Sequence, residues 1–104
     1  MDIKQLQRLY NTSGSNIKWA KHCLERMQER DISINDVEFC LQTGEIIEDY
    51  PDDFPHPSCL IFGNTKENKI LHIVVGSDTS NLFFITAYFP NTDKFEKDLK
   101  TRKR

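Results

Sequence analysis

The first part of the chain carries apolar residues at helical spacing. A short helix is predicted over residues 2–10, followed by a turn-rich stretch at residues 11–16. The apolar positions of this helix are Ile3, Leu6, Leu9 and Tyr10. A second helix is expected from about residue 17 to residue 30. Its apolar stripe would consist of Ala20, Cys23, Leu24 and Met27.

A third helix is expected to begin at Ser33, because Ser33 and Asp36 have the spacing of a capping box in which Asp replaces the usual Glu. Its apolar positions are Val37, Phe39, Cys40 and Leu41. Gly44 is expected to end this helix in the left-handed conformation, as glycine often does. Beyond Gly44 the apolar residues alternate with polar ones, which is typical of strands.

Four strands are predicted, at residues 45–50, 58–63, 69–76 and 82–89. Because the connections between them are short, neighbouring strands should be antiparallel. The pattern therefore predicts an α+β fold in which N-terminal helices pack on a four-stranded antiparallel β-meander. After Pro90, residues 92–99 are expected to form a short helix before a frayed end. We expect one domain over residues 1–104, with a core at about 17–90 and a basic tail at about 91–104.

Composition indicates an ordinary globular protein, with 38% hydrophobic and 29% charged residues among 104. No apolar run approaches the roughly 18 residues needed to span a bilayer, and the N-terminus lacks the profile of a secretory signal. We therefore expect no membrane association and a cytoplasmic location. The three cysteines are widely spaced, which argues against a disulfide framework and a structural metal site. They are expected to be small buried hydrophobes, and no cofactor is expected.

The net charge of −2 hides an asymmetry along the chain. Residues 45–53 are strongly acidic, whereas residues 94–104 are strongly basic. A protein that binds nucleic acid by charge alone is usually basic overall. RNA would therefore be bound through local patches.

One stripe of the second predicted helix combines His22, Arg26 and Arg30, which lie four residues apart. Like charges at this spacing weaken a helix unless anions lie against them. Those anions are either the protein's own carboxylates, with Glu25 and Glu29 nearest, or a phosphate group. We call these three residues the His22–Arg30 stripe.

A second polar patch is expected on the predicted sheet. In a tight hairpin His72 would lie beside Thr86 and Tyr88, although a register slip of one residue would separate them. Strand alternation would put Thr86 and Tyr88 on the same face as Leu82 and Phe84. The alternative for His72 is a hydrogen-bonded structural role.

These residue types suit the cleavage of RNA without a metal. Histidine is a suitable acid or base near neutral pH, and the arginine fork donates two parallel hydrogen bonds to phosphate oxygens. Tyr88 has a hydroxyl to donate and a ring on which a base can stack. The acidic residues 48–53 are expected either to be a solvated loop or to neutralise the arginines internally.

Four phrases of the chain resemble one known family. They are, in order, His22-x3-Arg26-Met27-x2-Arg30-x-Ile32-Ser33, Gly44-Glu-Ile-Ile-Glu-Asp-Tyr50-Pro51, Leu71-His72-Ile-Val-Val75 and Ile85-Thr86-Ala87-Tyr88-x-Pro90. Together they resemble the prokaryotic domain-of-unknown-function family 4258, over about residues 17–90. The chain departs from the family at Asp31, where glycine is expected.

The resemblance implies kinship with the RelE-like and barnase-like ribonuclease toxins, which pack N-terminal helices on an antiparallel sheet and use no metal. It implies a candidate site made of His22, Arg26, Arg30, His72, Thr86 and Tyr88. The leading hypothesis is a toxin-type, metal-independent endoribonuclease that acts on RNA and is paired with an antitoxin protein. Either His22 or His72 would be the acid or base. The alternative is a non-catalytic interaction module.

Overall fold

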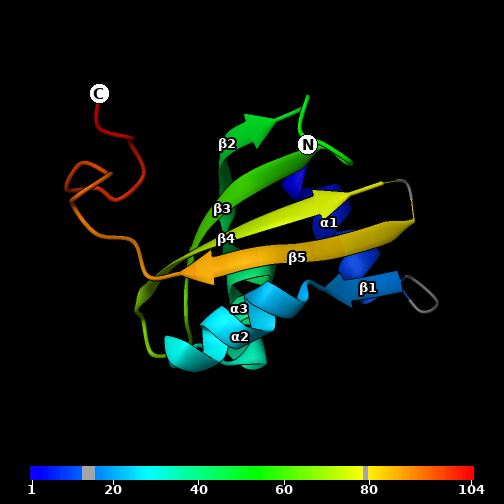
Figure 1. Ribbon diagram of the computed structural model, residues 1–104, viewed down its shortest axis with the longest axis horizontal. Helices are drawn as coiled ribbons and strands as arrows, with labels where there is room; N and C mark the ends of the chain where they lie inside the picture. Colours follow the sequence, from blue (N-terminus) through cyan, green and yellow to red (C-terminus); the bar gives the residue numbers. More distant parts are fainter. Residues whose placement is uncertain (13–15, 79) are drawn as a thin grey trace.

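A five-stranded mixed sheet forms the centre of the molecule. The computed structural model describes residues 1–12, 16–78 and 80–104. Within these ranges the strands lie in the order β1-β5-β4-β3-β2, in which β1 and β5 are parallel and the other neighbours are antiparallel (Figure 1). Their bounds are β1 Asn16–Trp19, β2 Glu45–Tyr50, β3 Ser58–Asn64, β4 Ile70–Ser77 and β5 Asn81–Tyr88. The α+β class is therefore confirmed, and the four predicted strands β2 to β5 do form an antiparallel meander. The prediction of a sheet with only these four strands is wrong, because β1 adds a parallel fifth strand.

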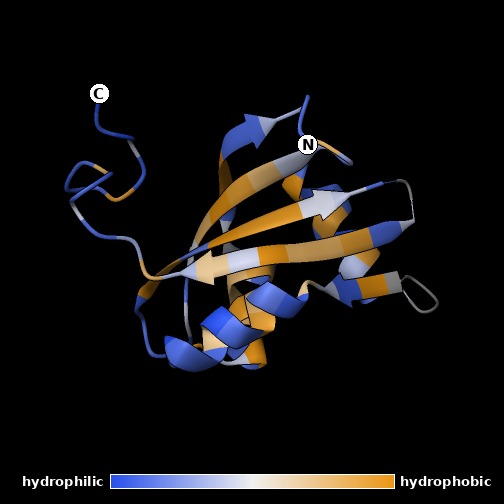
Figure 2. Ribbon diagram, in the orientation of Figure 1, coloured by the Kyte–Doolittle hydropathy of each residue, from blue (hydrophilic) through white to orange (hydrophobic). Residues whose placement is uncertain are grey.

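The helices α1 Ile3–Asn11 and α3 Ile34–Thr43 pack on one face of this sheet, whereas α2 Lys21–Glu29 lies along β5 and adds Cys23 and Met27 to the same core. In β4 the buried residues Leu71, Ile73 and Val75 belong to the core cluster shared with the helices. His72 alternates with them and therefore faces the opposite side, which we call the helix-free face. Figure 2 shows the apolar strands at the centre, with polar residues along the outer surface of α2. No helix within the described ranges is long and apolar enough to cross a membrane.

The second predicted helix begins later than expected, because residues 16–19 form β1 instead of a helical turn. The main-chain N–H of Ala20 donates to the carbonyl of Phe84 at 3.0 Å, so this segment pairs with the edge of β5. The Trp19 ring stacks on the Phe84 ring with centroids 4.1 Å apart. Trp19 thus belongs to β1, although the second helix was expected from about residue 17. Of the expected turn at 11–16, positions 13–15 lie outside the described residues.

A β-bulge in β5 changes which side chains share a face. Val74 pairs with Thr86 but Val75 pairs with Phe84, so Ile85 is an extra residue. Phe84 therefore packs in the core on the helix side, whereas Thr86 lies opposite Val74 on the helix-free face. The expectation that Thr86 and Tyr88 share a face with Leu82 and Phe84 is wrong, because strict alternation fails at the bulge.

The C-terminal segment is neither helical nor frayed. Residues 91–104, which we call the C-terminal strap, form turns closed by an isolated bridge between Phe95 and Arg102. Phe95 is only 2% exposed. Lys100 pairs with Glu45 at 2.9 Å. The strap thus contacts the acidic strand β2, and the helix expected at 92–99 is absent.

Gly44 ends α3 for a reason other than the one expected. Its backbone is extended (φ −90°, ψ −174°) and not left-handed. A Cβ atom at this position would lie 2.5 Å from the carbonyl oxygen of Cys40 and 2.6 Å from that of Phe62. Glycine is therefore needed because α3 and β3 approach too closely for a side chain. The capping box of Ser33 and Asp36 at the other end of α3 is confirmed.

The left-handed residue occurs instead at the end of α2. Asp31 has φ 59°, and the N–H of Ile32 donates to the carbonyl of Met27 at 2.9 Å, as in a Schellman motif. This is the position at which the family resemblance predicts glycine. An Asp here has both a strained backbone and a negative charge beside the negative end of the helix dipole.

We predict that Asp31→Gly stabilises the protein by about 0.5–1 kcal/mol, since it relieves both costs. The melting temperature should rise by a few degrees, roughly 2–8 °C for a domain of this size. The matched control is Asp52→Gly, in an exposed turn without positive φ. Thermal unfolding followed by circular dichroism measures both variants. Equal changes in the two would show that the left-handed position is not the cause.

Candidate functional site

A groove lies where the end of β5 meets the C-terminal end of α2 and the strap. Its volume is about 750 Å³. Its lining includes Arg30 at the C-cap of α2, Thr86 and Tyr88 from β5, and Lys94 and Arg102 from the strap. Three cations from segments far apart in the sequence thus converge beside a half-buried tyrosine. Such a mixture of positive charge and an aromatic hydroxyl suits an anionic ligand.

Arg30 reaches this groove because β5 has an open edge. β1 pairs with β5 only as far as Phe84. The carbonyl of Ala87 beyond that point accepts a hydrogen bond from Arg30 Nη1 at 2.8 Å. The side chain of Arg30 therefore satisfies a strand carbonyl that lacks a strand partner, and the guanidinium is fixed at the groove.

His72 is buried next to the groove and contacts Tyr88, which lines it. Its side chain is fully buried, and Nε2 lies 2.7 Å from the carbonyl oxygen of Leu99 while Nδ1 lies 3.1 Å from the hydroxyl of Tyr88. A carbonyl only accepts, so Nε2 carries the proton and donates to Leu99. Nδ1 is then the acceptor of the Tyr88 hydroxyl. The expected neighbourhood of His72 and Tyr88 is present, with the two residues directly paired across the strands.

The environment of His72 keeps the ring neutral. Burial lowers its pKa below the usual 6.5, and the nearby Arg102 acts in the same direction. The hydrogen bond to Leu99 and the charge of Glu48 oppose this shift. Burial also raises the pKa of Tyr88, so its hydroxyl keeps its proton at neutral pH. Tyr88 therefore donates to His72 in the resting protein.

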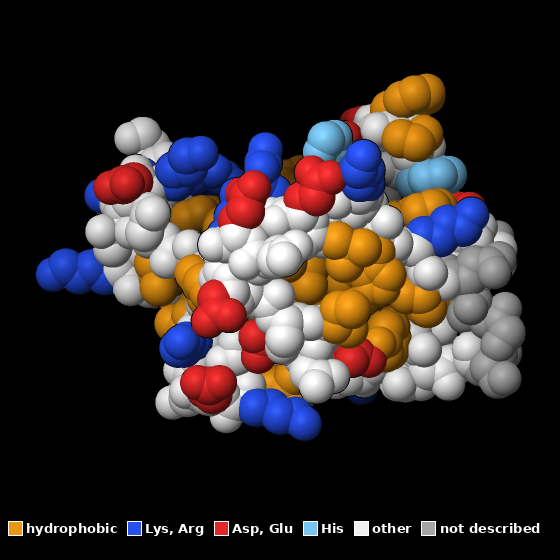
Figure 3. All heavy atoms as spheres, turned by 60° about the horizontal axis from the view of Figure 1, so that its bottom comes forward, with side chains coloured by type: hydrophobic (Ala, Val, Ile, Leu, Met, Phe, Trp, Pro, Cys, Tyr) orange, Lys and Arg blue, Asp and Glu red, His pale blue; other side chains and the backbone are white. Residues whose placement is uncertain are grey.

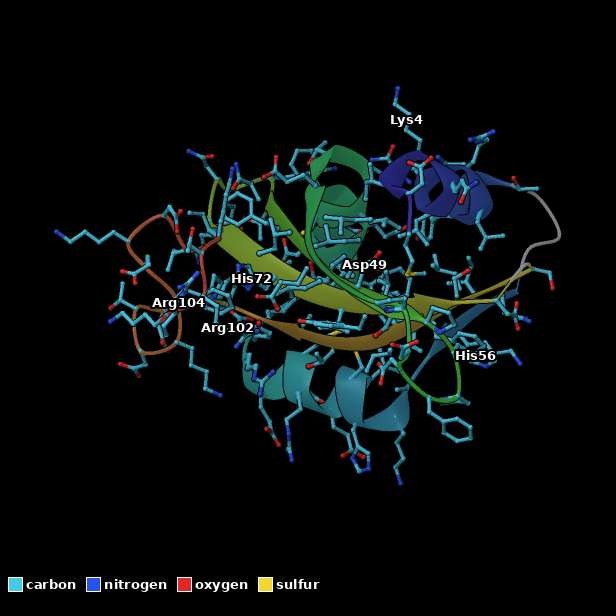
Figure 4. The ribbon with its side chains drawn as sticks, turned by 90° about the horizontal axis from the view of Figure 1, so that it is seen from above. Lys4, Asp49, His56, His72, Arg102 and Arg104 are labelled. Carbon is cyan, nitrogen blue, oxygen red and sulfur yellow. The ribbon has the colours of Figure 1, made fainter. Side chains whose placement is uncertain are left out.

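Arg102 is held by Glu48 through two hydrogen bonds, from Nε at 3.1 Å and from Nη2 at 2.9 Å. Its guanidinium carbon also lies 4.8 Å from the centre of the Phe95 ring. Tyr50 donates a further hydrogen bond to Glu48. The hydrogen bond from Arg102 lowers the pKa of Glu48, which keeps this carboxylate ionised. We call the Glu48–Arg102 pair the latch. Figure 4 shows Arg102 close to His72, at the opposite end of the sheet from His56.

The His22–Arg30 stripe does not act as a unit. His22 is exposed and lies 3.7 Å from Glu25, and Arg26 pairs with Glu29 at 3.2 Å. Glu25 and Glu29 are thus the local partners of these two residues on an exposed helix face, as one of the two alternatives expected. Only Arg30 of the stripe reaches the groove with Thr86 and Tyr88. Figure 3 shows acidic and basic side chains mixed on this side of the molecule, around a hydrophobic area.

Sequence reasoning did not include Glu48, Lys94 and Arg102 in the site. The available signal was the complementarity between the acidic residues 45–53 and the basic residues 94–104. We expected these carboxylates either to be solvated or to neutralise the helix arginines. The structure instead pairs Glu48 with the tail, because β2 and the strap meet across β3 and β4.

Metal-binding clusters and reactive thiols are two further features to consider among the described residues. No group of three or more His, Cys, Asp or Glu side chains is placed there to hold a metal ion. All three cysteines are buried and free. Burial raises the pKa of Cys40 and of Cys59 to about 12, so neither is a thiolate nucleophile at neutral pH.

Comparison with known families identifies the class of domain. The model of the family described as domain of unknown function DUF4258 matches residues 19–89. Because this range covers well over half of the chain, the protein belongs to the DUF4258 family. No curated protein and no solved structure matches it. Arg30, His72 and Tyr88 lie within the matched range, whereas Lys94 and Arg102 lie beyond it.

We predict that the free energy of unfolding decreases as the pH falls below about 6.5, because the unfolded chain then binds a proton that buried His72 resists. This stability is fully present above that pH and is lost as the pH falls through the folded-state pKa of His72. His72→Gln should flatten this part of the profile. His22→Gln, at an exposed position, should leave it unchanged. Urea unfolding at several pH values from about 8 to about 5 measures the effect, and equal profiles for both variants would contradict it.

Proposed function

We propose that this protein is a metal-independent endoribonuclease that cleaves RNA phosphodiesters in the groove. The observation that carries the proposal is the hydrogen bond of 3.1 Å between the Tyr88 hydroxyl and Nδ1, the unprotonated nitrogen of neutral, buried His72. Beside this pair lie three cationic side chains. A proton acceptor next to cations is the minimum equipment for phosphodiester cleavage without a metal.

Arg30, Lys94 and Arg102 would hold the phosphate. Arg30 donates one hydrogen bond to Ala87, and Arg102 donates two to Glu48. Because a guanidinium carries five N–H donors, each arginine keeps donors for phosphate oxygens. These contacts would strengthen as charge develops on the phosphorane in the transition state.

Tyr88 and His72 would remove the proton from the ribose 2′-hydroxyl. The 2′-hydroxyl proton passes to the Tyr88 oxygen while the Tyr88 proton passes to Nδ1 of His72. The 2′-oxygen then attacks phosphorus, and the bond from phosphorus to the 5′-oxygen breaks. The leaving oxygen takes a proton from water, and the proton on His72 returns to solvent through Tyr88. The products are a 2′,3′-cyclic phosphate and a 5′-hydroxyl.

The toxin assignment rests on the family resemblance and on the small α+β architecture. In this proposal the protein is related to the RelE-like and barnase-like toxins. Expression without its partner would then slow growth, and an antitoxin protein would bind it. Thr86 would line the RNA path beside Tyr88, whereas His22 and Arg26 have no direct part in the chemistry.

One observation favours a second function, that of a non-catalytic interaction module. Arg102 is already paired with Glu48, and His72 has both ring nitrogens satisfied by the protein itself. A site that is internally satisfied needs no substrate. In this alternative the groove cations would bind an acidic segment of a protein partner, and RNA would stay intact.

We predict that Tyr88→Phe lowers RNA cleavage by about 10²-fold or more, because proton transfer of this kind contributes at least that much. Arg30→Gln should also lower cleavage, through loss of phosphate contacts. The matched control is Arg26→Gln, four residues earlier on the same helix and outside the groove. It should retain wild-type activity. Cleavage of a single-stranded oligoribonucleotide in the presence of EDTA, with analysis of the product ends, measures all three.

An oligonucleotide with one 2′-deoxy residue at the cut position provides the substrate control, and it should resist cleavage there. Purified wild-type protein that leaves RNA intact, with harmless expression, would overturn the enzyme proposal. Equal activity of Tyr88→Phe and wild type would remove Tyr88 from the mechanism. Thermal unfolding of each variant separates loss of activity from loss of fold.

A further inference from the structure

The C-terminal strap contacts His72 at two points. The carbonyl of Leu99 accepts the hydrogen bond from Nε2 at 2.7 Å, and the Phe95 ring meets the imidazole edge to face with centroids 4.7 Å apart. These contacts come from a segment outside the range matched by the family. His72 therefore owes its full burial partly to residues that follow the sheet.

The Leu99 carbonyl decides which nitrogen of His72 carries the proton. The hydroxyl of Tyr88 both donates and accepts, so it pairs with either neutral tautomer. A carbonyl accepts only, and it therefore selects the Nε2–H form. This choice leaves the lone pair of Nδ1 directed at Tyr88. Of the two hydrogen bonds that the described residues make to the His72 ring, the one to Leu99 is therefore the one that distinguishes the tautomers.

The backbone of Leu99 does not hold this position by its own preference. Leu99 has φ 58°, in the left-handed region that leucine rarely adopts. Turn contacts support it on both sides. The N–H of Leu99 donates to Glu96 at 2.8 Å, and the Asp98 carboxylate accepts from the N–H groups of Lys100 and Thr101 at 2.9 Å and 3.0 Å.

The latch fastens this turn to the sheet. Arg102 of the strap pairs with Glu48 of β2, and it also lies over the Phe95 ring that packs on His72. A continuous series of contacts thus runs from Glu48 through Arg102 and Phe95 to the imidazole. The strap also supplies Lys94 and Arg102 to the groove, so it forms part of the site and does not merely cover it.

We propose that Glu48 is a positioning residue: through the latch with Arg102 it holds the strap, whose Leu99 carbonyl fixes His72 in the Nε2–H tautomer that accepts from Tyr88. This deepens the proposed nuclease site and rests on it for its catalytic meaning. The effect on the tautomer itself does not depend on RNA. Glu48 does not touch substrate in this proposal.

The test compares Glu48→Gln with Glu45→Gln, which removes the exposed ion pair to Lys100 but leaves the latch intact. Nitrogen NMR of the His72 ring, at a pH above its titration, reports the tautomer. Wild type and Glu45→Gln should show the single Nε2–H form, whereas Glu48→Gln should show a mixture of both. Arg102→Gln opens the latch from its other side and should give the same mixture, so the test survives misfolding of one variant.

Trypsin cleavage within the strap gives a second readout, with cleavage after Lys66 in an exposed loop as the internal reference. Strap cleavage in Glu48→Gln should rise by about fivefold, because a half-exposed ion pair such as this one contributes up to about 1 kcal/mol, which corresponds to about fivefold. It should change little in Glu45→Gln.

Two results would overturn the proposal. Faster strap cleavage in Glu48→Gln with an unchanged single tautomer would mean that Leu99 does not select it. Unchanged cleavage and tautomer in both latch variants would mean that the latch does not hold the strap. If the tautomer shifts as expected but wild-type protein leaves RNA intact, positioning by Glu48 is supported and the nuclease proposal fails.

Discussion

The rest of the site depends on the burial of one neutral imidazole. A buried histidine must have a partner for each ring nitrogen, because an unpaired polar atom away from water costs about 1–3 kcal/mol. His72 meets this requirement with Tyr88 across the strands and with the carbonyl of Leu99 from the strap. The first contact depends on the register of β4 and β5. The second keeps the end of the chain on the helix-free face, where it forms one wall of the groove.

Two sets of cations in this protein have different environments. His22 and Arg26 lie on the outer surface of α2, and their nearest partners, Glu25 and Glu29, belong to the same helix. The groove cations come from α2 and the strap, and tertiary contacts orient them. Arg30 shows the difference most clearly, because it has the same helical spacing as the other two residues but satisfies an open strand edge. Position at the end of α2, and not membership of the stripe, brings it to the groove.

Local pattern predicted much of the fold and some of the site. The three helices, the capping box at Ser33 and four of the strands follow from periodicity and turn chemistry, and the pairing of His72 with Tyr88 agrees with a tight hairpin. Two errors have a common origin in sheet edges and bulges. The segment Asn16–Trp19 forms a strand because β5 has an unpaired edge. Strict alternation predicts that the residues of β5 on either side of Ile85 share a face, but they face opposite sides of the sheet because Ile85 is an extra residue in the pairing with β4. Neither event has a strong signature in a single sequence.

The sequence by itself determined the three helices in outline, the strands β2 to β5, where α3 begins, and which residues have the chemistry to handle a phosphate. These depend on neighbours along the chain, so local periodicity reveals them. Only the tertiary structure decided that Arg30 belongs with Lys94 and Arg102, that Glu48 pairs with the tail, and that Leu99 supplies the partner of His72. Each of these contacts joins residues more than 25 positions apart. Their geometry is set by strand order, by the open half of the β5 edge and by the path of the strap, none of which a local pattern encodes.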